Sequence, residues 1–562
     1  MNVLCVGTSL GTISLIALGV LPIARIDLKV LTGNSCHIIH SVLSDSLSHL
    51  LVTVLESGRL SQIILDTGEL GSRHQEVMVV AQKYGQISAL MEYLALAIEG
   101  ITESWQNILI EMDSKLAAYA SRVPPGTVAA DFLELLMLGT ASDELLKFLV
   151  HDITEKGLKK LSQSVNLSYT NIQKLFAKHL QPVIRCISYH LADVLGMAAC
   201  SRRFGFLGLK TEIINHAMLA AGSLCYKTME AQQVTDYYKT SFATCFRWLH
   251  AVILRLSDES SSTESIGEME LRFIADFIVE NLDTEDRKHF TLEKVGQYLK
   301  DEDLPHPMSK QSKNNQWLKF LEENPWLKDS GLIIPKHENK SLIQEHKALT
   351  TAIKDAFLVQ PPEVLGSSVR VQWSQWLTSE IEDVNLRVSH YMKGDETYLL
   401  IFHEKRPASS VLVLLINKNS NVEAARIKFR NEEFVFLDFQ FYNEETVSFL
   451  IQDVPNATPI MIQMPWGSIS SGLKIQQQSD DFLYQRETLQ LHLLNLNGSY
   501  ERLEHTKAGY IAVSGSRKVA SVLSEDRKVI RLFEMEAEEE LDEEEIGDSS
   551  GGLIKGSDPA SG

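Results

Sequence analysis

A long helical stripe in the middle of the chain limits what this sequence can fold into. From Gln86 onwards, apolar residues recur one, three or four positions apart, which lines one face of an α-helix at 3.6 residues per turn. The stripe consists of Ile87, Leu90, Met91, Leu94, Ile98, Ile101, Trp105, Ile108, Leu109, Met112 and Leu116. Residues 1–66 and 367–533 instead alternate apolar and polar residues with a period of two. The patterns predict a helical block between two β-sheet segments.

Four long helices are predicted in the block, followed by shorter ones. They cover residues 86–118, 128–153, 157–191 and 210–256, and then 269–281, 291–300 and 342–359. Pro124 and Gly126 separate the first two helices, and Gly139 with the cap residue Ser142 predicts a break inside the second. Pro182 predicts a kink in the third helix. Because short connections join long amphipathic helices, we expect one antiparallel bundle with 86–118 packed against 157–191.

The flanking segments contain short strands separated by turn residues. The predicted strands are 13–18, 23–28, 38–43, 50–55 and 60–65, and then 398–402, 411–415, 434–441, 447–451, 460–464 and 489–494. Residues 509–533 hold three more strands, and Asn497-Gly498 is typical of a hairpin turn. Strands spaced about ten residues apart indicate a sandwich, a barrel or a propeller. A regular Trp-Asp repeat is not visible, so composition alone is only compatible with a propeller.

The charge of the chain argues against several classes of partner. A formal net charge of −20 opposes binding to nucleic acid backbones and to anionic membranes. Half of this charge lies between Glu534 and Asp548, a run with ten acidic residues and no basic one. Such a run repels itself and has too few apolar residues for a core, so residues 536–562 are predicted to form a disordered acidic tail.

The cysteines and the N-terminus bear on the cellular compartment. Six cysteines in 562 residues, with no Cys-x-x-Cys pair, do not form a disulfide framework and indicate the reducing cytosol or nucleus. No charged side chain occurs between Met1 and Arg25, which raises the possibility of a signal peptide or a membrane helix. Gly11 and Gly19 bracket a run that favours a buried strand between two turns instead.

Motifs for catalysis, cofactors or metals are weak in this sequence. Residues 547–551 match Gly-x-Ser-x-Gly, but they follow an acidic run and lack the strand and helix that a nucleophile elbow needs. Cys36, His37 and His40 have no second ligand pair, and in a regular strand the two histidines would point to opposite faces. We therefore predict no catalytic, cofactor-binding or metal-binding residues. Four tryptophans in irregular segments, Trp317, Trp326, Trp373 and Trp376, are candidates for core packing or for an interface.

Several separated motifs occur in a fixed order along the chain: Gly157–Ser164, Ser168–Leu175, Phe246–Leu249, Val295–Asp303, Leu437–Val447 and Arg517–Leu523 with Val529–Met535. Together they resemble subunit 4 of the anaphase-promoting complex. The resemblance covers nearly the whole chain and includes the acidic tail. It implies an α+β multidomain protein, in which a β-propeller of the WD40 type carries an inserted antiparallel bundle of long helices.

The resemblance also implies where the domains lie. Propeller blades are expected in residues 1–75 and 366–535, the helical bundle in 76–360 and the acidic tail in 536–562. Val3–Leu15 resembles the middle of the family's propeller rather than its beginning, so the propeller is expected to be incomplete. At about 40–45 residues per blade the two segments provide about five blades, with the bundle inserted between blades. An open ring leaves apolar blade faces exposed, so we expect the chain alone to aggregate and added upstream blade sequence to prevent this.

For function, the resemblance implies a non-catalytic scaffold of a cullin-RING ubiquitin ligase that drives cell-cycle progression through ubiquitin-dependent degradation. It implies contacts with subunits 1 and 5, a hetero-oligomeric state, no nucleic acid or membrane partner, and a location in the nucleus and cytoplasm. A second reading is a propeller-plus-helix scaffold of a vesicle coat or pore-type assembly, since fold alone does not fix function. A third is an enzyme hidden in the β segments, which the weak motifs disfavour.

Overall fold

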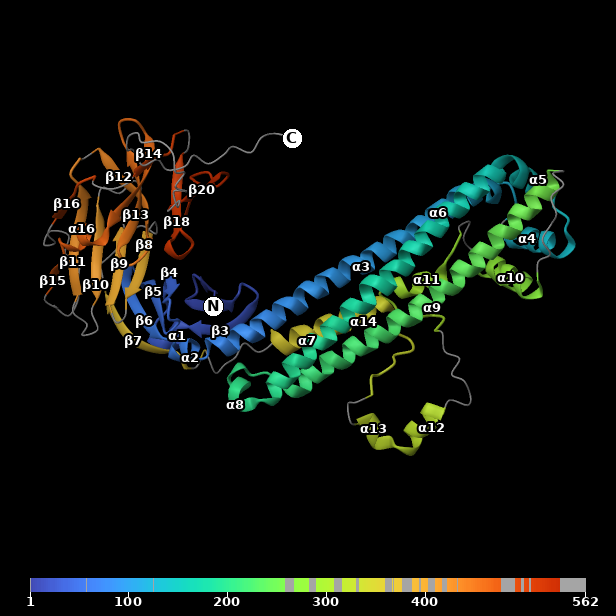
Figure 1. The fold of residues 1–562 in the computed structure, drawn as a ribbon, viewed down its shortest axis with the longest axis horizontal. Coiled ribbons are helices and arrows are strands. Elements are labelled where there is room, and N and C mark those ends of the chain that lie inside the picture. Colours follow the sequence, from blue (N-terminus) through green and yellow to red (C-terminus); the bar gives the residue numbers. More distant parts are fainter. Residues whose placement is uncertain are drawn as a thin grey trace, which may run out of the picture. The chain divides into compact units, whose positions relative to one another are not determined.

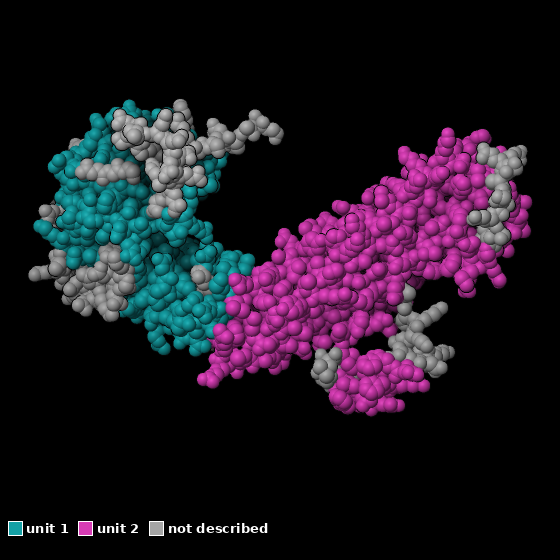
Figure 2. Space-filling model, viewed as in Figure 1, with its two compact units in different colours: residues 1–78, 362–562 teal, residues 79–361 magenta. Residues whose placement is uncertain are grey.

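The chain divides into two compact units (Figures 1 and 2). The computed structural model describes residues 2–535 apart from 57, 125, 258–266, 283–289, 308–315, 330–332, 359–365, 367, 377–386, 394–395, 403–409, 417–421, 432, 477–490, 497–499 and 505–506. The sheet unit combines residues 1–78 with 362–562, and the helical unit comprises residues 79–361. The predicted acidic tail, 536–562, lies outside the described residues.

The described strands of the sheet unit form five sheets. The first is β1 (Val3–Gly7), β2 (Thr12–Ala17) and β3 (Leu21–Asp27), and the second is β4 (His37–Leu43), β5 (His49–Glu56), β6 (Arg59–Asp66) and β7 (Arg370–Trp376). The third contains β8 (Arg387–Lys393), β9 (Glu396–Phe402), β10 (Val411–Ile416), β11 (Val422–Phe429), β15 (Lys474–Gln476) and β16 (Leu491–Leu494). The fourth is β12 (Phe434–Phe441), β13 (Thr446–Asp453), β14 (Thr458–Pro465) and β17 (Tyr500–Arg502), and the fifth is β18 (Ala508–Ser514), β19 (Val519–Ser524) and β20 (Ile530–Glu534). The three strands predicted in 509–533 are thus confirmed.

The helical unit is inserted inside the second sheet. Strand β7 pairs antiparallel with β6, from Asp66 opposite Arg370 to Ser61 opposite Trp376, although the whole helical unit lies between these strands in the chain. The expectation that the bundle lies between blades is therefore wrong, because it separates the third and fourth strands of one sheet. Consequently the second sheet is complete only when both flanks of the sequence fold together.

A shorter insertion separates the third and fourth strands of the fourth sheet, and its strands join the third sheet. After β14 the chain forms the short helix α16 (Trp466–Ser470) and then adds β15 and β16 to β11 of the third sheet, β16 in parallel orientation. It returns as β17, which pairs with β14. The hairpin predicted around Asn497-Gly498 is therefore wrong, since the strands on either side belong to different sheets. The turn residues themselves lie outside the described part of the chain.

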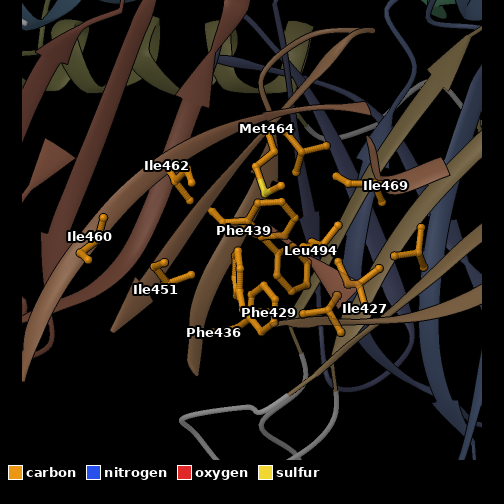
Figure 3. Close-up of a cluster of buried hydrophobic side chains, with 14 of the residues drawn as sticks. Ile427, Phe429, Phe436, Phe439, Ile451, Ile460, Ile462, Met464, Ile469 and Leu494 are labelled. Atoms are coloured by element: carbon orange, nitrogen blue, oxygen red, sulfur yellow. The ribbon is translucent and has the colours of Figure 1, made fainter. Parts of the chain in front are cut away.

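One apolar core cluster of the sheet unit lies between the third and fourth sheets (Figure 3). Alternate residues of β10 and β11 face alternate residues of β12, β13 and β14, as expected for strands with a period of two. Phe429 stacks on Phe436 with ring centroids 4.9 Å apart, and Phe436 packs against Phe449 at 5.5 Å. All three rings are fully buried, so this junction is stabilised mainly by removal of apolar surface from water.

In its described residues, the helical unit contains four long helical segments and several shorter helices. The long segments are α3 (His74–Ala120), α6 (Glu155–Lys174) continuing through the π-helical η2 (Leu175–Leu180) into α7 (Gln181–Ala199), α9 (Thr211–Leu256) and α14 (Leu342–Phe357). The others are α4 (Thr127–Leu138), α5 (Asp143–Lys147), η1 (Phe148–Ile153), α8 (Ser201–Phe204), η3 (Gly205–Leu207), α10 (Glu268–Leu282), α11 (Glu293–Gly296), η4 (Gln297–Leu299), α12 (Gln316–Glu323) and α13 (Pro325–Asp329). Helix α3 starts twelve residues before the predicted start at Gln86, because Gly85 does not interrupt it.

Polar contacts show that the long helices run antiparallel. Lys83 near the start of α3 bonds Asp193 near the end of α7 at 2.6 Å, whereas Asn171 in α6 donates to Ser104, further along α3, at 2.8 Å. Between α7 and α9, the side chain of Gln181 donates to Gln232 at 2.7 Å. Figure 1 shows α3, α6, α7 and α9 running alongside one another. The predicted packing of 86–118 against 157–191 is confirmed.

Two predicted helix signals can be located in the structure. The Ser142 hydroxyl accepts the backbone N–H of Leu145 at 3.3 Å and caps α5, after α4 ends at Gly139 with a left-handed backbone, φ 72°. Pro182 is the second residue of α7 and follows the π-helical turn η2, and the kink predicted at this residue stays a prediction. Among the described residues, no single helix is long and apolar enough to cross a membrane, and one pair that qualifies, Glu155–Ala199 with Ser201–Leu207, is bent by 86°.

Candidate functional site

Side-chain hydrogen bonds connect the first strands of successive sheets. The thiol of Cys5 in β1 donates to the hydroxyl of Ser41 in β4 at 3.2 Å. The Nδ1 atoms of His40 in β4 and His390 in β8 lie 2.9 Å apart. The hydroxyl of Ser389, also in β8, accepts the backbone N–H of Phe441 in β12 at 3.2 Å. The first four sheets are therefore joined in chain order through their first strands.

A buried carboxylate makes the link from the fourth sheet to the fifth. A bulge after Phe436 in β12 turns Asp438 so that its Oδ2 accepts the backbone N–H of Ile511 in β18 at 2.9 Å. Two residues along, Gln440 accepts the N–H of Val513 at 2.8 Å. These are side chain to backbone bonds, because the first strands face each other without forming a common ladder. The sequence analysis did not predict this link. The polar residues inside the otherwise apolar strand 434–441 are the signal that could have revealed it.

Arginine 387 adds a cation to the same junction. Its guanidinium lies 4.3 Å from the centroid of the Tyr510 ring in β18, and its Nε lies 3.9 Å from the Asp438 carboxylate. Since Arg387 belongs to β8, it joins the third sheet to both the fourth and the fifth. A cation held over an aromatic ring and beside a largely buried carboxylate stabilises this arrangement of three sheets.

The junction between the second and third sheets contains a buried polar cluster. His390 is buried, and its Nε2 lies 3.2 Å from both the Thr53 hydroxyl and the Gln62 carbonyl oxygen. Thr53 in turn donates to Gln62 at 2.7 Å. Burial lowers the pKa of His40 to about 4, with a further contribution from Arg387, and burial also lowers the pKa of His390. Both imidazoles are therefore neutral at neutral pH.

The sequence candidates Cys36, His37 and His40 do not come together as a metal site. A bulge between Ile38 and His40 shifts the register of β4, so that His37 pairs with Leu55 and His40 with Thr53. The two histidines thus share a face, and the expectation that they point to opposite faces is wrong. His40 nevertheless bonds His390, and the described residues contain no group of three or more His, Cys, Asp or Glu that could hold a metal ion.

On both sides of the helical insertion, the neighbouring residues of the sheet unit make close contacts within that unit. On the outgoing side, Thr67 is buried, and its N–H and hydroxyl donate to the carbonyls of Ser48 and Leu47 at 2.7 and 2.9 Å. On the return side, Gly366 approaches the carbonyl of Arg25 so closely that a Cβ there would lie 2.9 Å from the oxygen. A buried Val369 then leads into β7. The described residues that flank the insertion in the chain therefore pack within the sheet unit.

A buried lysine organises the interior of the helical unit. Lys227 of α9 lies 3.2 Å from the Glu230 carboxylate and donates to the backbone carbonyl of Glu338 at 3.4 Å. The hydroxyl of Tyr298 in η4 donates to the other oxygen of Glu230 at 2.8 Å, and burial together with this bond raises the pKa of Tyr298. Pairing within the network offsets the cost of burying the ammonium group. The network is structural and fixes the 333–341 segment to α9.

The tryptophan candidates fall on regular elements, which corrects their assignment to irregular segments. Trp317 and Trp326 lie on α12 and α13 and are exposed. Trp373 and Trp376 lie in β7, where they pair with Ile64 and Ser61 of β6. The motif at 547–551 lies outside the described residues.

Comparison with known proteins identifies the family. Residues 61–259 match the family described as "Anaphase-promoting complex, cyclosome, subunit 4", and residues 398–534 match "APC4, WD40 domain C-terminal half". Anaphase-promoting complex subunit 4 of Mus musculus is 32% identical over 98% of this chain and 73% of its own length. The Homo sapiens protein of the same name is 31% identical with the same coverage.

A more distant relative matches only part of the chain. The anaphase-promoting complex subunit 4 of Dictyostelium discoideum is 23% identical over 44% of this chain and 31% of its own length. The mammalian matches, by contrast, include both flanks of the sheet unit and the helical unit between them. The chain therefore belongs to the family of anaphase-promoting complex subunit 4.

Proposed function

We propose that this chain is a non-catalytic scaffold of the anaphase-promoting complex. In this role it supports a cullin-RING ubiquitin ligase that drives cell-cycle progression through ubiquitin-dependent degradation. The observation that supports this proposal is the pairing of β6 with β7. The chain leaves the sheet unit after β6, forms the helical unit and re-enters the sheet unit at β7. Such a construction presents two large surfaces on one chain without requiring a reactive centre.

The five sheets support a finer proposal about the fold. We propose that they are blades of one WD40-type propeller that is open between its first and last sheets among the described residues. Each first strand is linked by side-chain bonds to the first strand of the next sheet, from β1 through β4, β8 and β12 to β18. Strands that meet in chain order around a common centre are what a propeller requires.

Subunits 1 and 5 of the complex are the proposed direct partners, and the nucleus and cytoplasm are the proposed location. Mass spectrometry of the affinity-tagged chain should recover subunits of the anaphase-promoting complex and not those of a vesicle coat or a nuclear pore. Pairwise reconstitution with subunit 1 and with subunit 5 then tests direct contact, and imaging of a fluorescent fusion tests the location. Recovery of coat subunits alone would overturn the proposal.

The absence of catalysis is tested separately. The purified chain should not accelerate discharge of ubiquitin from a charged conjugating enzyme, whereas the assembled complex should. Burial raises the pKa of Cys245 to about 12 and also raises the pKa of Cys5 and Cys36, so these thiols are poorly suited to form thioesters. Discharge by the chain alone would refute the scaffold proposal.

A further inference from the structure

One long helical segment carries a charge opposite to that of the chain as a whole. Helix α6, the π-helical turn η2 and α7 together contain six lysines or arginines and only two acidic residues, whereas the chain has a formal net charge of −20. Both acidic side chains are engaged inside the helical unit. Glu155 lies 3.2 Å from the His250 imidazole, and Asp193 accepts a hydrogen bond from Lys83 at 2.6 Å. The segment is therefore a basic helix in an acidic protein.

The basic residues lie on the side of this segment that points away from the bundle. The buried stripe consists of Leu158, Leu161, Val165, Tyr169 and Ile172 in α6 and of Ile184, Ile187, Leu191 and Val194 in α7. At about 100° per residue, the opposite side carries Lys156, Lys160, Leu167, Lys174, Lys178 and Arg185. All six are exposed, and we call them the basic face. Within the described part of the chain, its four lysines form no ion pair with a carboxylate.

The basic face is narrow and long. On the α3 side, the exposed residues Glu92, Glu99 and Glu103 carry negative charge. On the α9 side, Asp236 accepts a hydrogen bond from Gln173 at 2.7 Å. From its first lysine to its arginine the face runs for roughly 45 Å, at 1.5 Å per residue. A helix lying along this segment matches such a shape better than a compact ligand does.

Apolar side chains are interleaved with the positive charges. Leu167 lies between Lys160 and Lys174 along the face and is 71% exposed. Tyr189, one helical turn after Arg185, is 63% exposed. Tyrosine and arginine are enriched where proteins meet each other. A molecule that covers this face therefore has to supply apolar groups as well as negative charge.

These requirements disfavour two other sources of negative charge. Nucleic acid supplies phosphates but no aliphatic side chains, and the negative charge of the whole chain opposes its approach. The acidic run of this chain between Glu534 and Asp548 has its large apolar residues, Met535, Leu541 and Ile546, six and five positions apart. That spacing does not place them on one side of a helix. The chemistry that fits is an acidic helix with an apolar stripe.

We propose that the basic face is a docking surface for an acidic amphipathic helix of another protein. The carboxylates of that helix pair with the lysine ammonium groups, and its apolar stripe covers Leu167 and Tyr189. Because the ion pairs lie at the surface, the affinity falls as salt is added. The surface goes beyond the proposed function, since it defines a partner by its chemistry and does not depend on which assembly contains the chain.

The test measures binding of a fluorescent peptide to the full chain. The probe is a synthetic helix of about 20 residues, roughly 30 Å long, with leucine at every third or fourth position and glutamate elsewhere. Lys160→Glu/Lys174→Glu should weaken binding by about tenfold or more. Arg272→Glu/Lys354→Glu, at exposed positions of α10 and α14, makes the same change of charge elsewhere and should bind normally. Circular dichroism and thermal melting establish that both variants fold.

The apolar part of the surface is tested separately. Leu167→Ser should weaken binding by about threefold, whereas Met137→Ser, at a position of α4 that is 80% exposed, should not. A peptide with the sequence of residues 534–548 should bind about tenfold less tightly than the probe, because it is acidic without an apolar stripe.

Three results would overturn the docking surface. They are equal binding by the two charge variants, equal binding of the 534–548 peptide, and tighter binding of a single-stranded oligonucleotide than of the probe. The assay uses the chain alone, so none of these results affects the subunit assignment, which is tested by recovery of the complex.

Discussion

The two central junctions of the sheet unit are built from different chemistry. Between the third and fourth sheets, aromatic rings such as Phe429, Phe436 and Phe449 fill the interior. Between the second and third sheets, His40 and His390 meet in a polar cluster. The apolar junction joins sheets whose strands all follow the helical insertion, whereas the polar junction joins the third sheet to strands β4, β5 and β6, which precede the insertion in the chain.

This difference suggests separate roles: the apolar junction contributes most to the stability of the sheet unit, and the polar junction determines how neighbouring sheets are aligned. Apolar packing is strong but weakly directional, so it tolerates small shifts between sheets. Buried hydrogen bonds contribute less net free energy but penalise any arrangement that leaves a donor or acceptor unpaired. The polar cluster should therefore fix how strands β4, β5 and β6 of the second sheet meet β8 of the third. The following experiments test this division, in order of decreasing expected effect.

Truncation of an aromatic ring should break the apolar junction most severely. Phe449→Ala removes a fully buried ring and leaves a cavity, so the free energy of unfolding should fall by about 3–5 kcal/mol. Urea denaturation of the purified chain measures the loss. Leu491→Ala, at an exposed position of β16, is the control and should change the free energy by less than about 0.5 kcal/mol. A loss below about 1 kcal/mol for Phe449→Ala would contradict the proposed source of stability.

Single and double substitutions should separate pairing from burial at the polar junction. His390→Leu leaves His40 without its partner and should cost about 1–3 kcal/mol. The double variant His40→Leu/His390→Leu removes both partners, so its cost should be clearly smaller than the sum of the single costs. A double-mutant cycle from urea denaturation measures this coupling. Additive costs would mean that the 2.9 Å contact does not couple the two sheets.

The polar junction should also be the more acid-sensitive of the two. His40 has a folded pKa of about 4, below its ordinary value of 6.5, and Arg387 and His390 are the groups that face it. The unfolded chain therefore binds a proton at this residue first, so the contribution of His40 to stability is fully present above pH 6.5 and is lost as the pH drops towards 4. Urea midpoints between pH 7 and pH 4 should show this loss, and His40→Leu/His390→Leu should flatten it. An equally steep fall in the double variant would assign the effect to other groups.

The smallest effect is expected at the junction of the first two sheets. Ser41→Ala removes the acceptor of the Cys5 thiol, and a thiol is a weak donor, so the free energy of unfolding should fall by only about 0.5 kcal/mol. Ser516→Ala, which lies in the turn η5 (Gly515–Arg517), is the control. If Ser41→Ala costs as much as His390→Leu, the first junction depends on hydrogen bonding to the same extent as the second.

Local features were predictable because they depend on neighbours in the sequence. The apolar stripe from Ile87 to Leu116 specified most of α3, and Ser142 specified the start of α5 by supplying its own cap. The pattern of residues 509–533 specified the three strands of the last sheet. The ordered motifs were also sufficient to place the chain in its family, which the comparisons confirm.

Features that join distant parts of the chain were settled only by the tertiary structure. Nothing local to Asp66 or Arg370 says that they pair, because the fourth strand of the second sheet arrives after the entire helical unit. The turn chemistry of Asn497-Gly498 was outweighed by partners available to β16 and β17 in two other sheets. A single bulge placed His37 and His40 on one face, and strand alternation alone cannot foresee that shift. Periodicity thus determined which residues form helices and strands, whereas the choice of partner depended on contacts between sheets that form only once the chain has folded.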